Sequence, residues 1–170
     1  MNDGYQVTYG DYRPFSQPTY DKADSPGKLT AIVLLVQRGW KPKDDSERYK
    51  LGDLIMEKNG LFASFEVEVR QGSWKTGAWP KHYKTIHFPP RKQDSPVDFF
   101  ITFNESLDHA LIASGSTVRN EKRRDVRDAI DHVAKQVNKN HSFVDVPLDQ
   151  SWELSLVNGV WETIRKPKLG

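Results

Sequence analysis

The chain contains no cysteine. This absence excludes disulfide scaffolds, zinc sites built on thiolates and cysteine nucleophiles, and it suits a reducing compartment. Long apolar runs are also missing, because the longest, Ala31 to Val36, is far shorter than the roughly 20 residues that cross a bilayer. The first residues show no basic region followed by an apolar one, so no secretory signal is expected. We therefore expect a soluble cytoplasmic protein with no membrane partner.

The length and composition favour one globular domain. The 170 residues are 36% hydrophobic and 11% aromatic, which is enough for a modest core. Residues 1–24 combine Gly, Pro, Ser, Asp and Tyr without helical or alternating periodicity. We expect an irregular N-terminal arm over residues 1–24 and one domain over residues 25–170.

The net charge of +2 is small, but the cations are unevenly distributed. Between Arg70 and Lys92 there are six cations and no acidic residue, interleaved with aromatic and histidine side chains. This composition suits phosphate contacts together with stacking on bases, and it predicts a nucleic-acid interface. The alternative is an ordinary lysine-rich surface whose tryptophans cover the core. The residues predicted to bind nucleic acid are Arg70, Trp74, Lys75, Lys81, Lys84, Arg91 and Lys92.

The first regular element is expected between Pro26 and Arg38. Ser25 suits a helix N-cap, Pro26 the first helical position and Gly39 a C-terminal stop, so the pattern favours a buried helix. A strand through Ala31 to Val36 remains the alternative, because a short apolar run does not distinguish the two by periodicity.

Two hairpins are expected next. Asn59-Gly60 lies between two alternating segments, Tyr49–Glu57 and Leu61–Arg70, and this dipeptide is the strongest short-range hairpin signal. The segments Val97–Phe103 and His109–Ala113 are expected to pair in the same way.

The last third of the chain predicts a helix and a short further element. Within residues 120–138, four apolar residues recur at helical spacing, which favours an amphipathic helix; they are Val126, Ile130, Val133 and Val137. The C-terminal segment is expected to add a short strand or helix that holds Trp152 and Trp161.

Carboxylates gather on one side of the first hairpin. Strand alternation places Glu66, Glu68 and Arg70 on one face, and symmetric pairing about the turn puts Asp53 opposite Glu66. Close carboxylates repel unless a cation lies between them, and Mg²⁺ prefers such oxygen ligands. The pattern therefore predicts a metal site. The alternatives are a solvated sheet face carrying Glu66 and Glu68, and a simple turn at Asp53.

Other site chemistries are disfavoured. His82 and His87 have no cysteine partners and no HExxH pattern, so a zinc site is not expected. The chain also lacks a G-x-S-x-G elbow, a phosphate-binding loop and a dinucleotide fingerprint.

The order of elements and the residues Asp53, Glu66 and Glu68 resemble the PD-(D/E)XK nuclease superfamily over residues 25–103. In that superfamily an Asp precedes a (D/E)-x-K motif on the next strand. Asp53 matches the Asp and Glu66 the acidic position, whereas Glu68 stands where the Lys is usual; in the alternative frame, Arg70 replaces the Lys. The resemblance implies a single α/β domain with a central mixed β-sheet flanked by helices, in an αβββαβ core.

The same resemblance implies a function. It predicts a metal-dependent endonuclease, resolvase-like or restriction-like, that hydrolyses DNA with Mg²⁺ or Mn²⁺. Asp53 and Glu66 would hold the metal, and Glu68 would complete the catalytic site. A homodimer is left open. One alternative is a catalytically inactive module of the same fold that binds nucleic acid or protein, and another is an interaction protein whose aromatic loop docks a protein partner.

Overall fold

The computed structural model describes residues 6–9, 17–43, 52–131 and 135–168. Strands make up 46% of it and helices 20%. The helical elements are α1 (Gln17–Gln37), η1 (Pro90–Asp94), α3 (Gly115–Asn120) and η2 (Leu148–Gln150). The strands are β1 (Gln6–Tyr9), β2 (Lys41–Pro42), β3 (Leu54–Lys58), β4 (Leu61–Val69), β5 (Thr85–Phe88), β6 (Phe99–Phe103), β7 (His109–Ser114), β8 (Arg124–Asp131), β9 (Gln136–Pro147), β10 (Trp152–Val157) and β11 (Val160–Arg165).

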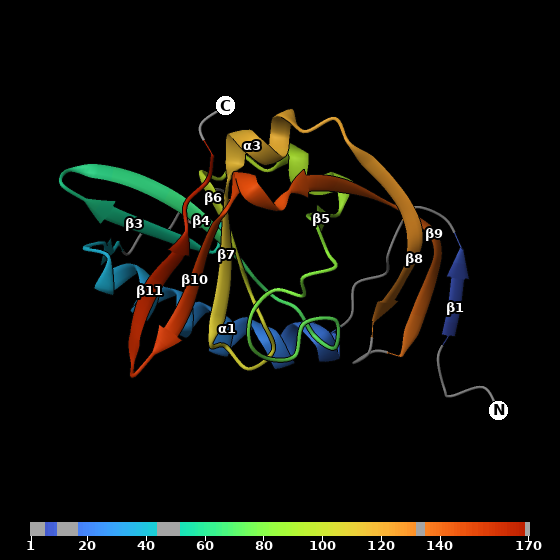
Figure 1. Cartoon of the computed structure of the whole chain (residues 1–170), viewed down its shortest axis with the longest axis horizontal. Helices are drawn as coiled ribbons and strands as arrows, with labels where there is room; N and C mark the ends of the chain where they lie inside the picture. Colours follow the sequence, from blue (N-terminus) through green and yellow to red (C-terminus); the bar gives the residue numbers. More distant parts are fainter. Residues whose placement is uncertain (1–5, 10–16, 44–51, 132–134, 169–170) are drawn as a thin grey trace.

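The strands form two sheets (Figure 1). The large sheet has the order β11-β10-β7-β6-β4-β3-β2, in which only the β4–β6 pair is parallel. In the small sheet β9 is paired with β1, β5 and β8. In Figure 1, β8 and β9 curve away from the large sheet toward β1.

Each face of the large sheet is covered by a different layer. Ile101 belongs to a core cluster with Leu34 and Leu35 of α1, whereas its neighbour Phe100 packs with Phe88 of β5 and Val144 of β9. This follows from strand alternation, which sends consecutive side chains to opposite faces. The centre of the sheet is therefore buried on both faces, by a helix on one side and by the small sheet on the other.

The predicted α/β fold with helices flanking the sheet is wrong. The large sheet is mixed, as predicted, but its second face is covered by strands. The main cause lies in residues 120–138, where an amphipathic helix was predicted and the structure has β8, a turn at Lys135 and the start of β9. The apolar residues of that pattern are β-branched, and such side chains favour strands; Val133 lies outside the described residues.

Several other predicted elements agree with the structure, in whole or in part. The helix ends near Arg38 as predicted, but it begins at Gln17 and continues through Pro26, so the predicted start is wrong. Both predicted hairpins form, and Leu54 pairs with Phe65 in the predicted register; residues 49–51 of the first hairpin lie outside the described part. The C-terminal segment forms the β10–β11 hairpin, which carries both Trp152 and Trp161. The segment predicted as an irregular arm contains β1 and the start of α1.

No helix among the described residues is both long enough and apolar enough to cross a membrane.

Candidate functional site

Asp53 is fixed at the start of β3 by the main chain around it. Gly52 precedes it with a φ of +139°, and a Cβ there would lie 2.7 Å from Val97 Cγ1 and 2.9 Å from the carbonyl oxygen of Phe65. Only glycine fits this close approach without strain. The Asp53 N–H donates to the Phe65 carbonyl at 2.9 Å, and its Oδ2 accepts from the Val67 N–H at 2.8 Å. Asp53 is therefore held on the β4 main chain by the residues on either side of Glu66.

Glu66 is held by residues that are distant in the sequence. Its Oε1 forms an ion pair with Nζ of Lys92 in η1, and its Oε2 accepts from the Ser95 hydroxyl at 3.2 Å. A second lysine reaches the site from α1, since Lys28 Nζ lies 3.7 Å from Asp53 Oδ1. Lysines from α1 and η1 therefore each reach one of these carboxylates. We call Lys28, Asp53, Glu66, Lys92 and Ser95 the carboxylate site.

Close helix packing brings Lys28 to this place. Gly27 is buried against β4, and a Cβ at this position would lie 2.8 Å from Val69 Cγ2. The missing side chain lets α1 approach β4 closely. The next residue, Lys28, then reaches the Asp53 carboxylate at the start of β3.

The carboxylate site is partly shielded from solvent but remains open. The side chain of Lys92 is 14% exposed, and those of Glu66, Lys28 and Asp53 are 21%, 24% and 30% exposed. Burial lowers the pKa of Lys92 below its usual value, and the negative charge of Asp53 acts in the opposite direction. Lys92 therefore contacts Glu66 and also feels the charge of Asp53, which itself pairs with Lys28.

This arrangement suits a hard cation. Mg²⁺ is commonly bound by one or two carboxylates, with water and phosphate oxygens as the remaining ligands. Asp53 and Glu66 provide that donor chemistry. Within the described ranges, no three His, Asp or Glu side chains are grouped so as to hold a metal ion. A metal at this site would therefore depend on two protein carboxylates and on water or substrate.

Glu68 and Arg70 belong to a different contact. Glu68 Oε1 lies 3.1 Å from Arg70 Nε, and the Arg70 guanidinium donates to His87 Nε2 at 3.0 Å and to the His87 carbonyl at 2.5 Å. Arg70 is only 8% exposed, so it links the large sheet to β5 instead of facing solvent. Burial, together with the charges of Arg70 and Arg127, lowers the pKa of His87 to about 3.

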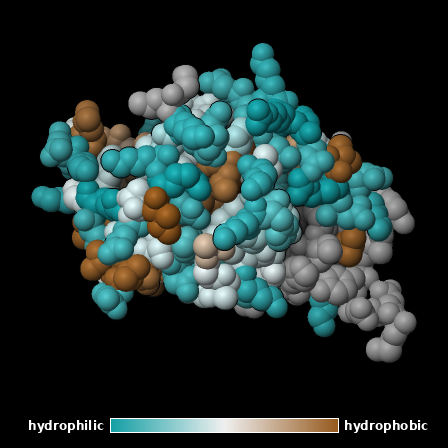
Figure 2. Space-filling view, in the orientation of Figure 1, coloured by the Kyte–Doolittle hydropathy of each residue, from teal (hydrophilic) through white to brown (hydrophobic). Residues whose placement is uncertain are grey.

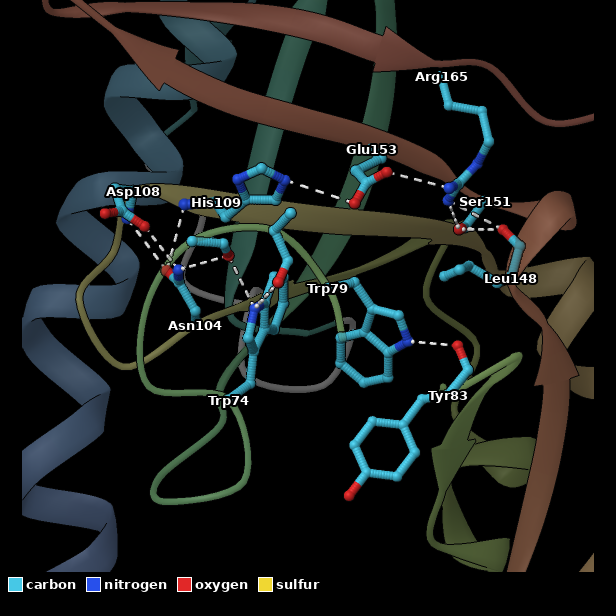
Figure 3. Close-up of polar contacts among 12 residues, drawn as sticks. Trp74, Trp79, Tyr83, Asn104, Asp108, His109, Leu148, Ser151, Glu153 and Arg165 are labelled. Atoms are coloured by element: carbon cyan, nitrogen blue, oxygen red, sulfur yellow. Dashed lines mark hydrogen bonds and ion pairs between the residues drawn. The ribbon is translucent and has the colours of Figure 1, made fainter. Parts of the chain in front are cut away.

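The tryptophans of the basic loop lie in the core. Trp74 is 2% exposed and Trp79 is 7% exposed, and their rings meet edge to face at 4.9 Å. Each indole N–H donates to a loop carbonyl, Trp74 to Gly77 at 2.9 Å and Trp79 to Tyr83 at 3.0 Å (Figure 3). Trp74, predicted to stack on bases, is thus occupied by packing, as the alternative interpretation of this loop expected.

Figure 3 also shows a buried polar cluster that the sequence did not indicate. Glu153 Oε1 lies 3.4 Å from His109 Nε2, and its Oε2 accepts from Arg165 at 3.0 Å. Arg165 also donates to the Ser151 hydroxyl and to the Leu148 carbonyl. We call these five residues the Glu153 network. Contact with His109 lowers the pKa of Glu153, and burial acts against this shift. Ser151 is fully buried and His109 is 5% exposed, whereas the side chain of Arg165 is 28% exposed, so the network is shielded on the side of His109 and Ser151.

Two groups of exposed cations lie near the segment predicted to bind nucleic acid. Four residues predicted to bind nucleic acid are exposed; they are Lys75, Lys81, Lys84 and Arg91. A second group, missed in the sequence, follows α3: Lys122, Arg123 and Arg124 are exposed. Gln93 of η1 donates to the carbonyls of Val118 and Glu121 at 3.0 and 2.8 Å, which brings this group close to Arg91. Figure 2 shows hydrophilic side chains gathered over α3 and the segment leading into β8.

Comparisons with known proteins do not assign the chain to a family. No protein-family model matches it, and neither the curated proteins nor the solved structures contain a significant match. The resemblance to PD-(D/E)XK nucleases therefore rests on the motif residues, and the fold that it implied does not form.

Proposed function

We propose that the protein is a divalent-metal-dependent phosphodiesterase that cleaves DNA, an endonuclease in which Asp53 and Glu66 hold Mg²⁺ or Mn²⁺. The observation that carries this proposal is the convergence of the carboxylate site. Asp53 and Glu66 each pair with a lysine from a separate element, and the charge of Asp53 also acts on Lys92, in a region that solvent still reaches. Such convergence of charge is typical of sites that act on phosphate groups.

Each charged residue of the carboxylate site has its own role in this proposal. Asp53 and Glu66 bind the cation, and Lys28 and Lys92 supply positive charge toward a phosphate. When bound, the metal activates water and stabilises the charge that develops on the scissile phosphate. Glu68 has no part in the proposed machinery, because it pairs with the buried Arg70.

The exposed cations supply the binding surface. Arg91 adjoins Lys92 in η1, and Gln93 joins η1 to the segment that carries Lys122 and Arg123. Phosphate contacts by such residues give affinity without sequence preference. The proposal places DNA along this surface, in a cytoplasmic protein.

Cleavage of plasmid and of branched DNA, measured with Mg²⁺, with Mn²⁺ and with EDTA, tests the proposal. Cleavage should require the cation, and both Asp53→Asn and Glu66→Gln should reduce it by at least about a hundredfold while DNA binding persists. Glu68→Gln is the matched control, since it removes a carboxylate from the same strand face two residues away. Metal-dependent cleavage that survives in both Asp53→Asn and Glu66→Gln would exclude this site.

A second candidate is a module that binds nucleic acid without cleaving it. Its specific support is that Lys28 and Lys92 already neutralise both carboxylates, so the site is electrostatically complete without a metal. DNA binding that weakens steeply with salt, with no cleavage by the purified chain, would favour this function.

A further inference from the structure

The turn that carries Lys92 is fixed independently of its ammonium group. Lys92 N–H donates to the Pro89 carbonyl at 3.0 Å, and Ser95 N–H donates to the Lys92 carbonyl at 3.2 Å. Gln93 anchors the same turn to the carbonyl groups at the end of α3, and Ser95 also donates to Glu66. The ion pair between Lys92 and Glu66 is therefore not needed to position η1.

The ammonium has the freedom to leave Glu66. A lysine carries its charge as a compact group on a flexible unbranched stem, so Nζ can move while the backbone stays in place. Arg70 is different, because its planar guanidinium is held by Glu68 and by two acceptors of His87. Lys92 and Arg70 both contact a glutamate of β4. Among the contacts of the described residues, the Lys92 ammonium is held by the Glu66 side chain, without a main-chain acceptor.

We propose that Lys92 is an exchangeable counter-ion of the carboxylate site, which competes with a divalent cation for Glu66. This inference rests on the proposed function. Without metal, the ammonium relieves the repulsion between Glu66 and Asp53, which a shared cation would otherwise relieve. When a cation binds, the ammonium is released from Glu66, remains tethered to η1 and becomes available to a substrate phosphate. Lys92 therefore weakens metal binding and assists substrate binding at the same site.

Lys28 competes less than Lys92. Its Nζ lies 3.7 Å from Asp53 and its side chain is more exposed, whereas Lys92 is in direct contact with Glu66 and is 14% exposed. Screening by water reduces the charge interaction of the more exposed pair. Removing the charge of Lys92 should therefore increase the affinity for the metal more than removing the charge of Lys28.

Direct titration of the full-length chain with Mn²⁺, followed by calorimetry and by the paramagnetic resonance signal of free Mn²⁺, tests the inference without an activity assay. Lys92→Met should bind Mn²⁺ about tenfold more tightly than the unmodified chain, because the competing charge is gone. Lys92→Arg should stay close to the unmodified chain, and Lys28→Met should show a smaller gain. Lys84→Met is the control, since it removes an exposed cation of the same basic segment and should leave the affinity unchanged.

Thermal unfolding gives a second readout. In EDTA, Lys92→Met should melt at a lower temperature than the unmodified chain, and Mn²⁺ should raise its melting temperature by more. Lys92→Gln removes the same charge with a polar side chain and serves if Lys92→Met does not fold. Equal or weaker Mn²⁺ affinity in both charge-removing variants overturns the inference.

The two proposals fail in different ways. If the unmodified chain binds Mn²⁺, and Asp53→Asn and Glu66→Gln abolish that binding while Lys92→Met leaves it unchanged, the metal site stands and the counter-ion role falls. If neither the unmodified chain nor Lys92→Met binds Mn²⁺ through these carboxylates, both proposals fall.

Discussion

The carboxylate site and the Glu153 network contain similar charges in different settings. In the Glu153 network, one carboxylate is held by His109 and Arg165, and Arg165 is itself held by a hydroxyl and a carbonyl. In the carboxylate site, Lys28 and Lys92 contact the carboxylates from flexible stems. Glu153 is 11% exposed as a side chain, whereas Asp53 is 30% exposed.

This difference separates charges that hold the fold from charges that can exchange partners. A buried carboxylate whose partners also bind the main chain loses much if one member is removed. A partly exposed pair joined by a lysine contributes less to stability and can accept another cation. The comparison predicts that substitutions in the Glu153 network reduce stability, and that substitutions in the carboxylate site reduce metal binding and activity.

The largest stability effect is expected at Glu153. Glu153→Ala leaves His109 and Arg165 without their shared carboxylate, and we expect a loss of about 3 kcal/mol in the free energy of unfolding. Denaturant unfolding followed by tryptophan fluorescence measures this loss, because Trp74 and Trp79 pack beside the network. A loss below about 1 kcal/mol would contradict the structural role assigned to this network.

Acidification should destabilise the link between the two sheets. The pKa of His87 in the folded chain, about 3, lies below its usual value of 6.5, so the unfolded chain binds the proton more readily. The contribution of neutral His87 to the free energy of unfolding is therefore complete above pH 6.5 and decreases as the pH falls below it. Between pH 7 and pH 5 this contribution should decrease by about 2 kcal/mol. Unfolding measured at several pH values should show this slope, and His87→Gln should flatten it. An unchanged slope in His87→Gln would assign the pH dependence to other groups.

Neutralising the carboxylate site should cost little stability. We expect Asp53→Asn and Glu66→Gln each to change the free energy of unfolding by about 1 kcal/mol or less in EDTA, because both pairs are partly exposed. The same denaturant experiment compares them with Glu153→Ala. Losses as large as that of Glu153→Ala would remove the distinction between the two regions.

The surface cations should have the smallest effect on the folded chain and a graded effect on DNA. Replacing Lys122 and Arg123 together by glutamine should leave stability unchanged and reduce the slope of log affinity against log salt by about 2, since each phosphate contact contributes about 0.9. Fluorescence anisotropy with a labelled duplex measures this slope. Lys41 and Lys43, replaced in the same way, are the control at the β2 edge of the large sheet. An unchanged slope in the Lys122 and Arg123 variant would place the DNA elsewhere.

Local signals explain which parts of the fold were predictable. The Asn59-Gly60 turn fixes the register of its hairpin, and this was enough to place Asp53 next to β4, where its N–H donates to the Phe65 carbonyl. Asn158-Gly159 is the same signal, with both residues at positive φ, and it marks the β10–β11 hairpin that was predicted only as a strand or helix. Residues 120–138 misled because their apolar spacing fits a helix, whereas pairing with β9 and β-branched side chains favour strands.

Local pairing also explains why only the carboxylates of the candidate site could be predicted from the sequence. The hairpin register pairs Leu54 with Phe65, and the Asp53 N–H donates to the Phe65 carbonyl, so the position of Asp53 next to β4 follows from local pairing. Lys92 and Lys28 arrive from η1 and α1 through tertiary packing, which no spacing in the sequence encodes. The aromatic residues of the basic loop had two interpretations, and burial decided for the core in the case of Trp74 and Trp79.

The most direct measurement is the anomalous difference density of Mn²⁺ in crystals of the full-length chain grown or soaked with MnCl₂. We expect a peak about 2.0 to 2.4 Å from carboxylate oxygens of both Asp53 and Glu66, with Lys92 Nζ moved away from Glu66. A Lys92 that still contacts Glu66, with no manganese peak at these two carboxylates, would contradict it.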